Sequence, residues 1–327
     1  MNEFPARIAS RAMAAIVLAA FSLVTACSDN GRASVYTPFE ELSFADPVLR
    51  ACVLTEAERH GWERSGQMTR LVCTNAEGTP IRSLDGIENL VNLQELDLAH
   101  NEITDIRLID RLERLARLDL GYNRIENAAL SRLRITLKWL NLDHNNIADA
   151  SWLSNLRHLK SLSMGHNRLS DIASVAELTD LESLDLSHNQ IASIASLEPV
   201  QGLRELDLGS NLIADISAIE NHRHLVIVLL YNNRIATVDR LAGFPILEEL
   251  DLSRNRLTDI APLSAVISLR RLNLGFNQIT DPTPLETLGA IDLLILKGNP
   301  MSCEMEQRMV AAFGADTVAA DACAKTP

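Results

Sequence analysis

The sequence LQELDLAHNEI, residues 93–103, recurs through most of the chain with constant spacing. Related copies are LARLDLGYNRI at residues 115–125 and LESLDLSHNQI at residues 181–191. Leucines at fixed offsets would give every copy the same apolar face. A pattern LxxLxLxxN with a period of roughly 20–29 residues predicts a solenoid of stacked coils. The asparagine recurs every 22 residues without a slip, at Asn101, Asn123, Asn145, Asn167, Asn189, Asn211, Asn233, Asn255, Asn277 and Asn299.

These repeats resemble the leucine-rich repeat family, and their 22-residue length is similar to that of bacterial internalins and SDS22-like phosphatase regulators. The resemblance implies an α/β solenoid, a horseshoe with a concave parallel β-sheet, short 3₁₀ or helical turns on the convex side, and helical caps. Ten coils over residues 87–299 would make a sheet roughly 45–50 Å long. Each asparagine should point inward, where its buried amide must bond backbone groups.

A second column of residues stands four places after the first nine asparagines, and its members commonly cap helices. They are Asp105, Asn127, Asp149, Asp171, Ser193, Asp215, Thr237, Asp259 and Asp281. We therefore expect a short helical or 3₁₀ turn on the convex side of each coil. Arg134 and His222 fall where a core leucine is expected, and Ala128 and Ala150 replace a convex isoleucine. Packing should be slightly looser near residues 126–152.

Residues 1–26 have the features of an export signal, namely Arg7 and Arg11 followed by an apolar stretch over residues 12–26. That stretch is too short and too rich in alanine for a comfortable membrane span.

The end of this signal, VTAC at residues 24–27, resembles the lipobox of bacterial lipoproteins. The resemblance implies cleavage before Cys27 and its acylation with fatty acids such as palmitate, which gives stable anchoring. Ser28 in the next position implies transfer to an outer membrane. The alternative is a plain secretory signal that happens to end at a cysteine.

The segments around the repeats predict a tether and two caps. Residues 27–38 are polar and contain Gly and Pro, as in a tether. Residues 39–86 predict an N-terminal helical cap and a degenerate first coil, and residues 300–327 predict a C-terminal cap. In the first cap, Asp46-Pro47 should begin a helix. A second polar helix is expected at residues 55–60.

All five cysteines lie outside the repeats, at Cys27, Cys52, Cys73, Cys303 and Cys323. With Cys27 acylated, four remain for two bridges. Cys52 on the cap helix is well placed to pair with Cys73 on the first strand, and an exported chain would keep that bridge. The C-terminal segment resembles the cysteine-bearing cap of extracellular leucine-rich repeat proteins, without its four-cysteine form. This leaves Cys303–Cys323 as the remaining pair.

The composition argues against several functions. The formal net charge is −13, and without the export signal, which carries +1, it is near −14. Such a surface repels phosphate backbones, so we expect no nucleic-acid partner. There is no Gly-rich phosphate loop and no GxSxG, CxxC or HExxH motif. We therefore expect a monomeric binding protein that is not an enzyme and has no cofactor.

One outward row stands four places before each asparagine: Asp97, Asp119, Asn141, Ser163, Asp185, Asp207, Leu229, Asp251, Asn273 and Ile295. Neighbouring carboxylates in this row would lie about one strand spacing apart, which suits a cation or a basic ligand. The alternative, which we favour here, is that these aspartates belong to the ordinary repeat pattern and are solvated.

The row directly before the asparagines holds His100, Tyr122, His144, His166, His188, Ser210, Asn232, Arg254 and Phe276. Three successive imidazoles, His144, His166 and His188, are weak candidates for zinc ligands or a pH response. The favoured alternative is that these imidazoles bond the backbone of a turn, because a flat row meets zinc geometry poorly.

Apolar side chains on the concave face, where the repeat pattern is polar, are the best candidates for a partner contact. They comprise Ile227, Leu229, Tyr231 and Phe276, with Arg254 between them and Tyr122 and Trp139 further back. Leu293 and Ile295 are also apolar, but the C-terminal cap should cover them.

These features predict an envelope-anchored lipoprotein, in an outer membrane, that binds a protein through its concave face as an adhesin, receptor or scaffold. Glycan or peptidoglycan binding by the same face is an alternative, although its few aromatics are dispersed. A third possibility, an SDS22-like regulator in the cytosol, conflicts with the export signal and the cysteines.

Overall fold

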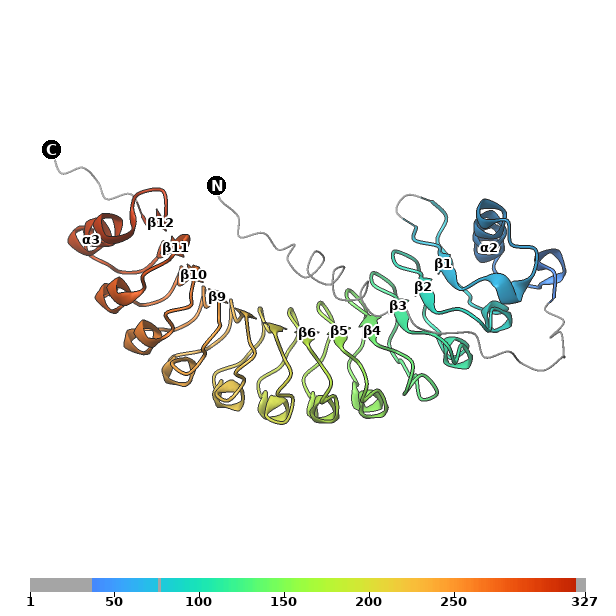
Figure 1. Ribbon diagram of the computed structural model, residues 1–327, viewed down its shortest axis with the longest axis horizontal. Helices are drawn as coiled ribbons and strands as arrows, with labels where there is room; N and C mark the ends of the chain where they lie inside the picture. The colour runs from blue at the N-terminus through green and yellow to red at the C-terminus, as the bar shows by residue number, and fades with distance from the viewer. Residues whose placement is uncertain (1–36, 76–77, 322–327) are drawn as a thin grey trace.

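The structure is a computed structural model that describes residues 37–75 and 78–321. This part of the chain forms a curved solenoid with the strands on its inner side and short turns on its outer side (Figure 1). Twelve strands make one open parallel sheet, in the order of the sequence. They are β1 (Arg70–Val72), β2 (Glu95–Asp97), β3 (Arg117–Asp119), β4 (Trp139–Asn141), β5 (Ser161–Ser163), β6 (Ser183–Asp185), β7 (Glu205–Asp207), β8 (Ile227–Leu229), β9 (Glu249–Asp251), β10 (Arg271–Asn273), β11 (Leu293–Ile295) and β12 (Val318–Ala319).

From β2 to β11 the register of the sheet follows the repeat, because residues 22 apart pair across neighbouring strands, as Leu162 pairs with Leu184. The middle residue of each strand points into the core, and Leu96, Leu118 and Leu140 are fully buried. Since side chains alternate along a strand, the residues on either side of these leucines face the concave surface. The predicted horseshoe with a parallel concave sheet is confirmed.

The ten repeat asparagines form a continuous hydrogen-bonded ladder inside the coils. Asn167 is typical: its Oδ1 accepts the Ile147 N–H at 3.0 Å, and its Nδ2 donates to the carbonyls of Leu142 at 2.9 Å and Met164 at 3.1 Å. Two of these three bonds reach the preceding coil. All ten side chains are less than a tenth exposed. The ladder therefore ties each coil to the one before it.

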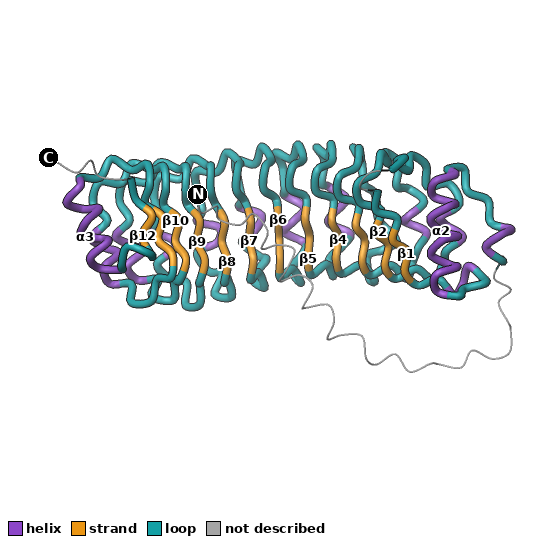
Figure 2. The backbone as a smooth tube through the Cα atoms, turned by 90° about the horizontal axis from the view of Figure 1, so that it is seen from above, coloured by secondary structure: helices purple, strands orange, loops and turns teal. Residues whose placement is uncertain are grey.

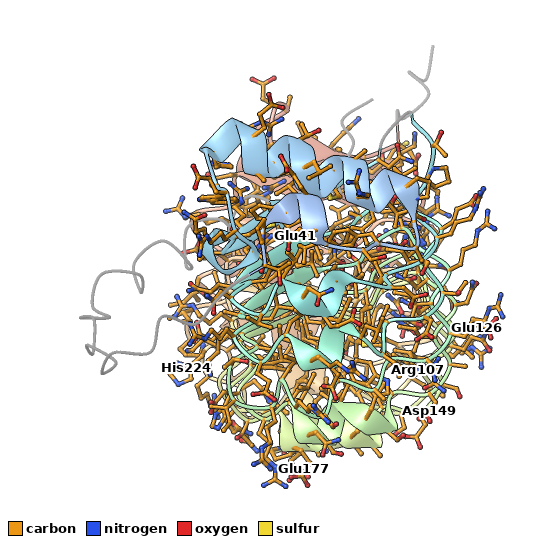
Figure 3. The ribbon with its side chains drawn as sticks, turned by 90° about the vertical axis from the view of Figure 1, so that its right-hand side faces the viewer. Glu41, Arg107, Glu126, Asp149, Glu177 and His224 are labelled. Atoms are coloured by element: carbon orange, nitrogen blue, oxygen red, sulfur yellow. A yellow bond between two sulfur atoms is a disulfide. The ribbon has the colours of Figure 1, made fainter. Side chains whose placement is uncertain are left out.

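The convex side consists of 3₁₀ turns, as predicted: η3 (Ile87–Asn89), η4 (Ile109–Arg111), η5 (Ser151–Asn155), η6 (Ala173–Glu177), η7 (Ala195–Leu197), η8 (Ser217–Ile219), η9 (Asp239–Leu241), η10 (Ala261–Ala265) and η11 (Thr283–Thr287). The polar residue before a turn accepts the N–H two places on, as Asp171 accepts that of Ala173 at 2.8 Å. Viewed from the N-terminal end, Glu177 lies at the bottom, on the convex side, and Glu126 and Asp149 lie on the right-hand flank (Figure 3).

One coil lacks a 3₁₀ turn, the coil at residues 126–136. Leu133 fills the core position there and Arg134 is exposed, so the placement of Arg134 in the core was wrong. The chain shifts by one residue because burying a guanidinium without a partner is costly. By contrast, His222 does occupy a core position, fully buried, with Nε2 3.1 Å from the Leu197 carbonyl. Ala128 and Ala150 are buried, and looser packing around them stays a prediction.

The N-terminal cap is built around helix α2 (Pro47–His60), with η1 (Phe39–Glu41) and η2 (Ser65–Gln67) beside it. The Asp46 carboxylate begins the helix by accepting the N–H groups of Val48 at 2.8 Å and Leu49 at 3.2 Å. The prediction of a second helix at residues 55–60 was wrong, because α2 continues without a break to Gly61. Within it, the Thr55 hydroxyl donates to a carbonyl of the same helix.

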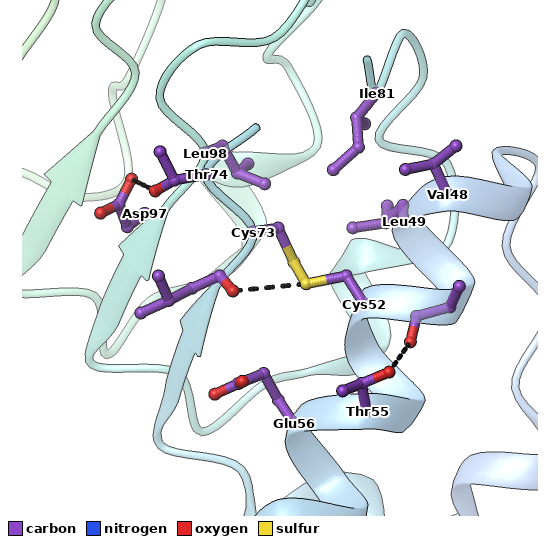
Figure 4. The surroundings of a disulfide bond; sticks show 12 residues. Val48, Leu49, Cys52, Thr55, Glu56, Cys73, Thr74, Ile81, Asp97 and Leu98 are labelled. Carbon is purple, nitrogen blue, oxygen red and sulfur yellow. Dashed lines mark hydrogen bonds between the residues drawn. A yellow bond between two sulfur atoms is a disulfide. The ribbon is translucent and has the colours of Figure 1, made fainter. Parts of the chain in front are cut away.

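A disulfide joins this cap to the first coil (Figure 4). Cys52 projects from α2 and pairs with Cys73, with the two Cα atoms 5.9 Å apart and 21 residues apart in sequence. A loop of that length predicts a stabilisation of about 3 kcal/mol.

The C-terminal cap consists of helix α3 (Cys303–Phe313) followed by β12, which pairs with β11. The sequence had not indicated this additional strand. Cys303 is exposed at the first turn of α3, and Cys323 lies outside the described residues, so their pairing stays a prediction. The predicted signal, Cys27 and most of the tether also lie outside the described residues.

We predict that Asn167→Ala destabilises the protein by about 2–4 kcal/mol, because the buried Ile147 N–H loses its acceptor and two shared carbonyls each lose one donor. The exposed Asn221 outside the ladder provides the control, and Asn221→Ala should change stability by less than about 0.5 kcal/mol. Urea unfolding of the two variants measures the difference. Equal losses of stability in the two variants would show that a ladder asparagine stabilises the fold no more than an exposed asparagine does.

Candidate functional site on the concave face

The strands of the sheet lie side by side along the concave face (Figure 2). Residues six, four and two places before each asparagine form three rows across this face. The structure brings Ile227, Leu229 and Tyr231 together in these rows on coil seven, as predicted from their spacing. Arg254 and Phe276 lie in a different row, along the loop edge that follows the strands.

Aspartates on this face accept hydrogen bonds from the turns that end the strands. The carboxylates of Asp185, Asp207 and Asp251 accept backbone N–H groups two residues on, at 2.9, 2.9 and 2.8 Å. Asp143, two places before its asparagine, accepts the Ser163 hydroxyl at 2.6 Å and the Gly165 N–H at 2.7 Å. These bonds hold the carboxylates close to the sheet.

Their position close to the sheet raises the pKa of several of these carboxyl groups. Burial, followed by the charge of Asp185, raises the pKa of Asp143 to about 7. Burial also raises the pKa of Asp119 to about 6, and it raises the pKa of Asp207 well above its ordinary value together with the charge of Asp185. The favoured expectation that the aspartates of this row are solvated was therefore wrong for Asp119 and Asp207, which are half-buried, and for Asp251, which is buried. Asp143 was missed, because it stands two places before its asparagine and so outside the expected row.

Tyr231 joins the aspartate row to the histidine row. Its hydroxyl lies 3.3 Å from His188 Nε2, and its ring covers Gly209, where an added Cβ would lie 2.1 Å from a ring atom. Burial and the charges of Asp207 and Asp185 raise the pKa of its phenol. Tyr231 is thus half-buried and fixed in place, which the sequence had not indicated.

The five rings of the histidine row form a stack: His100, Tyr122, His144, His166 and His188, with centroids 3.9–4.2 Å apart. Each residue of the row has a positive φ of 52–58°, so successive side chains leave the backbone in the same way and their rings come into register. Burial and the neighbouring imidazoles lower the pKa of His166 to about 4.

This stack does not suit zinc. The lone pairs of parallel rings lie in the ring planes and do not converge on one point. Among the described residues, no group of three His, Cys, Asp or Glu side chains has metal-binding geometry. The imidazoles instead line a shallow open depression of about 580 Å³ with Ser210.

The remaining predicted contacts differ in exposure. Phe276 is 47% exposed, with the Arg254 guanidinium 4.5 Å from its ring centre, and Tyr122 is 48% exposed. Trp139 is only 7% exposed, with Arg117 lying 3.4 Å from its ring centre, so its prediction as an available aromatic was wrong.

Comparisons with known proteins agree with this architecture. The family description "Leucine rich repeat" matches residues 135–191, and "Leucine Rich repeats (2 copies)" matches residues 91–132, 179–221 and 245–287, together more than half of the chain. The chain belongs to the leucine-rich repeat family. No curated protein matches it in sequence. Within the described residues, no helix has the length and apolar character that crossing a membrane requires.

Solved leucine-rich repeat structures resemble it over most of its length. An internalin of Listeria monocytogenes is 26% identical with a TM-score of 0.73, over 90% of this chain and all of that chain. A leucine-rich repeat protein of Leptospira interrogans is 22% identical with a TM-score of 0.50, over 77% and 84% of the two chains. The ectodomain of an Arabidopsis thaliana membrane receptor kinase, solved with Casparian strip integrity factor 2, is 26% identical with a TM-score of 0.56, over 67% and 31%.

The raised pKa of Asp143 predicts a pH-dependent difference between the wild type and Asp143→Asn. Between about pH 4 and 7 the unfolded chain loses a proton that the folded carboxyl keeps, so this carboxyl destabilises the fold as pH rises. The wild type should lose about 1 kcal/mol or more relative to the variant across this window. Histidines with lowered pKa values make the fold more stable as pH rises. Both proteins contain these histidines, so subtracting the stability of the variant from that of the wild type removes their contribution.

Urea unfolding at several pH values measures this difference. A constant offset between the two proteins from pH 4 to 8 would show that the Asp143 carboxyl titrates alike in the folded and unfolded states.

Proposed function

We propose that this leucine-rich repeat protein is a lipoprotein of the bacterial envelope that binds a protein partner through its concave face. The observation that carries the proposal is the apolar set on coil seven, where Ile227 and Leu229 replace the polar residues found at the same positions of neighbouring coils. Apolar side chains grouped on a polar face mark interaction sites more often than scattered ones do.

The family and its relatives support the same class of function. Solenoid repeats use their concave surface for binding. The chain spans the full length of the internalin structure, and the plant receptor ectodomain was solved in complex with Casparian strip integrity factor 2. The stacked ring faces favour protein over glycan, because His144 and His166 cover each other's faces and leave little ring surface for a sugar.

The lipid anchor is the second part of the proposal. It rests on the lipobox-like residues 24–27 and on the predicted acylation of Cys27. An outer-membrane location follows from Ser28 by the same resemblance, and exposure on either face of that membrane would suit an adhesin, receptor or scaffold.

We predict that Leu229→Ser combined with Phe276→Ser lowers capture of the partner by about tenfold or more, because apolar anchors carry most of the binding free energy. Both changes should preserve the fold, since serine occupies the equivalent positions at Ser163 and Ser210. Ile267→Ser, which removes an isoleucine that is 73% exposed elsewhere, is the matched control.

Crosslinking in intact envelopes followed by quantitative mass spectrometry measures the capture, and thermal melting checks the fold. Recovery of the protein with membranes, and its release by Cys27→Ser, tests the anchor. Unchanged capture by the double variant would rule out these two side chains as the binding surface.

A further inference from the structure

Acidic and apolar side chains alternate across the concave face over β7, β8 and β9. In the register of the sheet, Ile227 lies between Glu205 and Glu249, and Leu229 lies between Asp207 and Asp251. We call these six residues the acidic–apolar face. Neighbouring strands lie about 4.8 Å apart, so two pairs of carboxylates flank an apolar strip roughly 10 Å across.

These carboxylates have few positive neighbours. In the described part of the chain, the one ion pair at this face joins Glu249 Oε2 to Arg271 at 3.4 Å, and Asp207 and Asp251 have none. Asp207 and Asp251 instead accept hydrogen bonds from their own turns. Like charges held this close repel each other, and a cation placed between them would relieve the repulsion.

Glu249 provides an independent observation. The residue is only 6% exposed and shares β9 with Asp251, yet its Oε1 atom has no hydrogen-bond partner. A buried acceptor without a donor costs free energy, and unsatisfied groups of this kind are rare in folded proteins. A donor that arrives with a ligand would satisfy this atom.

We propose that the acidic–apolar face binds a peptide segment in which an apolar side chain stands between basic side chains. Arginine or lysine would contact the carboxylates on both sides and donate to Glu249 Oε1, while the apolar side chain packs against Ile227 and Leu229. The inference rests on the proposed protein-binding function and specifies its ligand. The net charge of −13 attracts such a segment at long range.

Fluorescence anisotropy on the full chain tests this inference with synthetic labelled peptides at physiological salt. The probe alternates arginine and leucine, and two matched probes alternate glutamate and leucine, or arginine and serine. We expect the arginine–leucine peptide to bind, the arginine–serine peptide to bind more weakly and the glutamate–leucine peptide not to bind.

The variant Asp207→Asn with Asp251→Asn should weaken binding of the arginine–leucine peptide by about tenfold or more, because two charge-assisted contacts are lost. It should fold, since asparagine occupies the same position at Asn141 and Asn273. Glu113→Gln with Glu126→Gln makes the same change in charge at exposed positions away from this face, and it should change binding by less than about twofold.

Three results would overturn the inference: no binding of the arginine–leucine peptide, equal binding of the glutamate–leucine peptide, or equal weakening by the two double variants. The proposed function would survive any of them if partner capture from envelopes still depends on Leu229 and Phe276. Loss of that dependence would remove the protein-binding proposal itself.

Discussion

The asparagine ladder solves a hydrogen-bonding problem that a coil of 22 residues creates. Each coil turns sharply after a three-residue strand, and the turn leaves backbone N–H and carbonyl groups inside the solenoid without partners in the sheet. The side-chain amide of Asn167 supplies one acceptor and two donors in that space, and it joins its own coil to the previous one. Because the same bonds recur at all ten positions, the spacing of the coils follows from them.

The concave face inherits its geometry from this ladder. The residue before each asparagine is held at a positive φ, so the rings of His144, His166 and His188 come into register and stack. Aspartates at the strand ends cap the same turns and are held near the sheet, where burial raises the pKa of Asp119 and Asp207. A structural need of the turn thus brings acidic groups together on the surface that is free for a ligand.

The architecture could be predicted from sequence because its determinants recur at constant spacing. Leucine and asparagine periodicity indicated the coils and the inward asparagines, and the capping residues four places after the asparagines indicated the convex 3₁₀ turns. The helical cap also followed from a local signal, Asp46-Pro47. Errors arose where a polar residue stood at a core position, because the fold can respond in two ways. At Arg134 the chain shifts by one residue and leaves the side chain exposed, whereas His222 is buried in the core.

The candidate site was less predictable, because it depends on side-chain contacts between coils. Row position correctly placed Ile227 and Leu229 together, but it could not show that Arg117 covers Trp139 or that Tyr231 crosses Gly209 to reach His188. Acidity was misjudged for a similar reason. The exposure of an aspartate depends on how the neighbouring turns pack around it, and aligned repeat positions in a sequence do not show that packing.

Native-state hydrogen exchange of the full chain tests the central claim most directly. The ladder predicts slow exchange at the N–H groups bonded to asparagine Oδ1, such as those of Ile103, Ile147 and Ile191, with protection recurring every 22 residues. Exchange at these amides as fast as in exposed convex loops would contradict the account, because the coils would then be held together by something other than the asparagines.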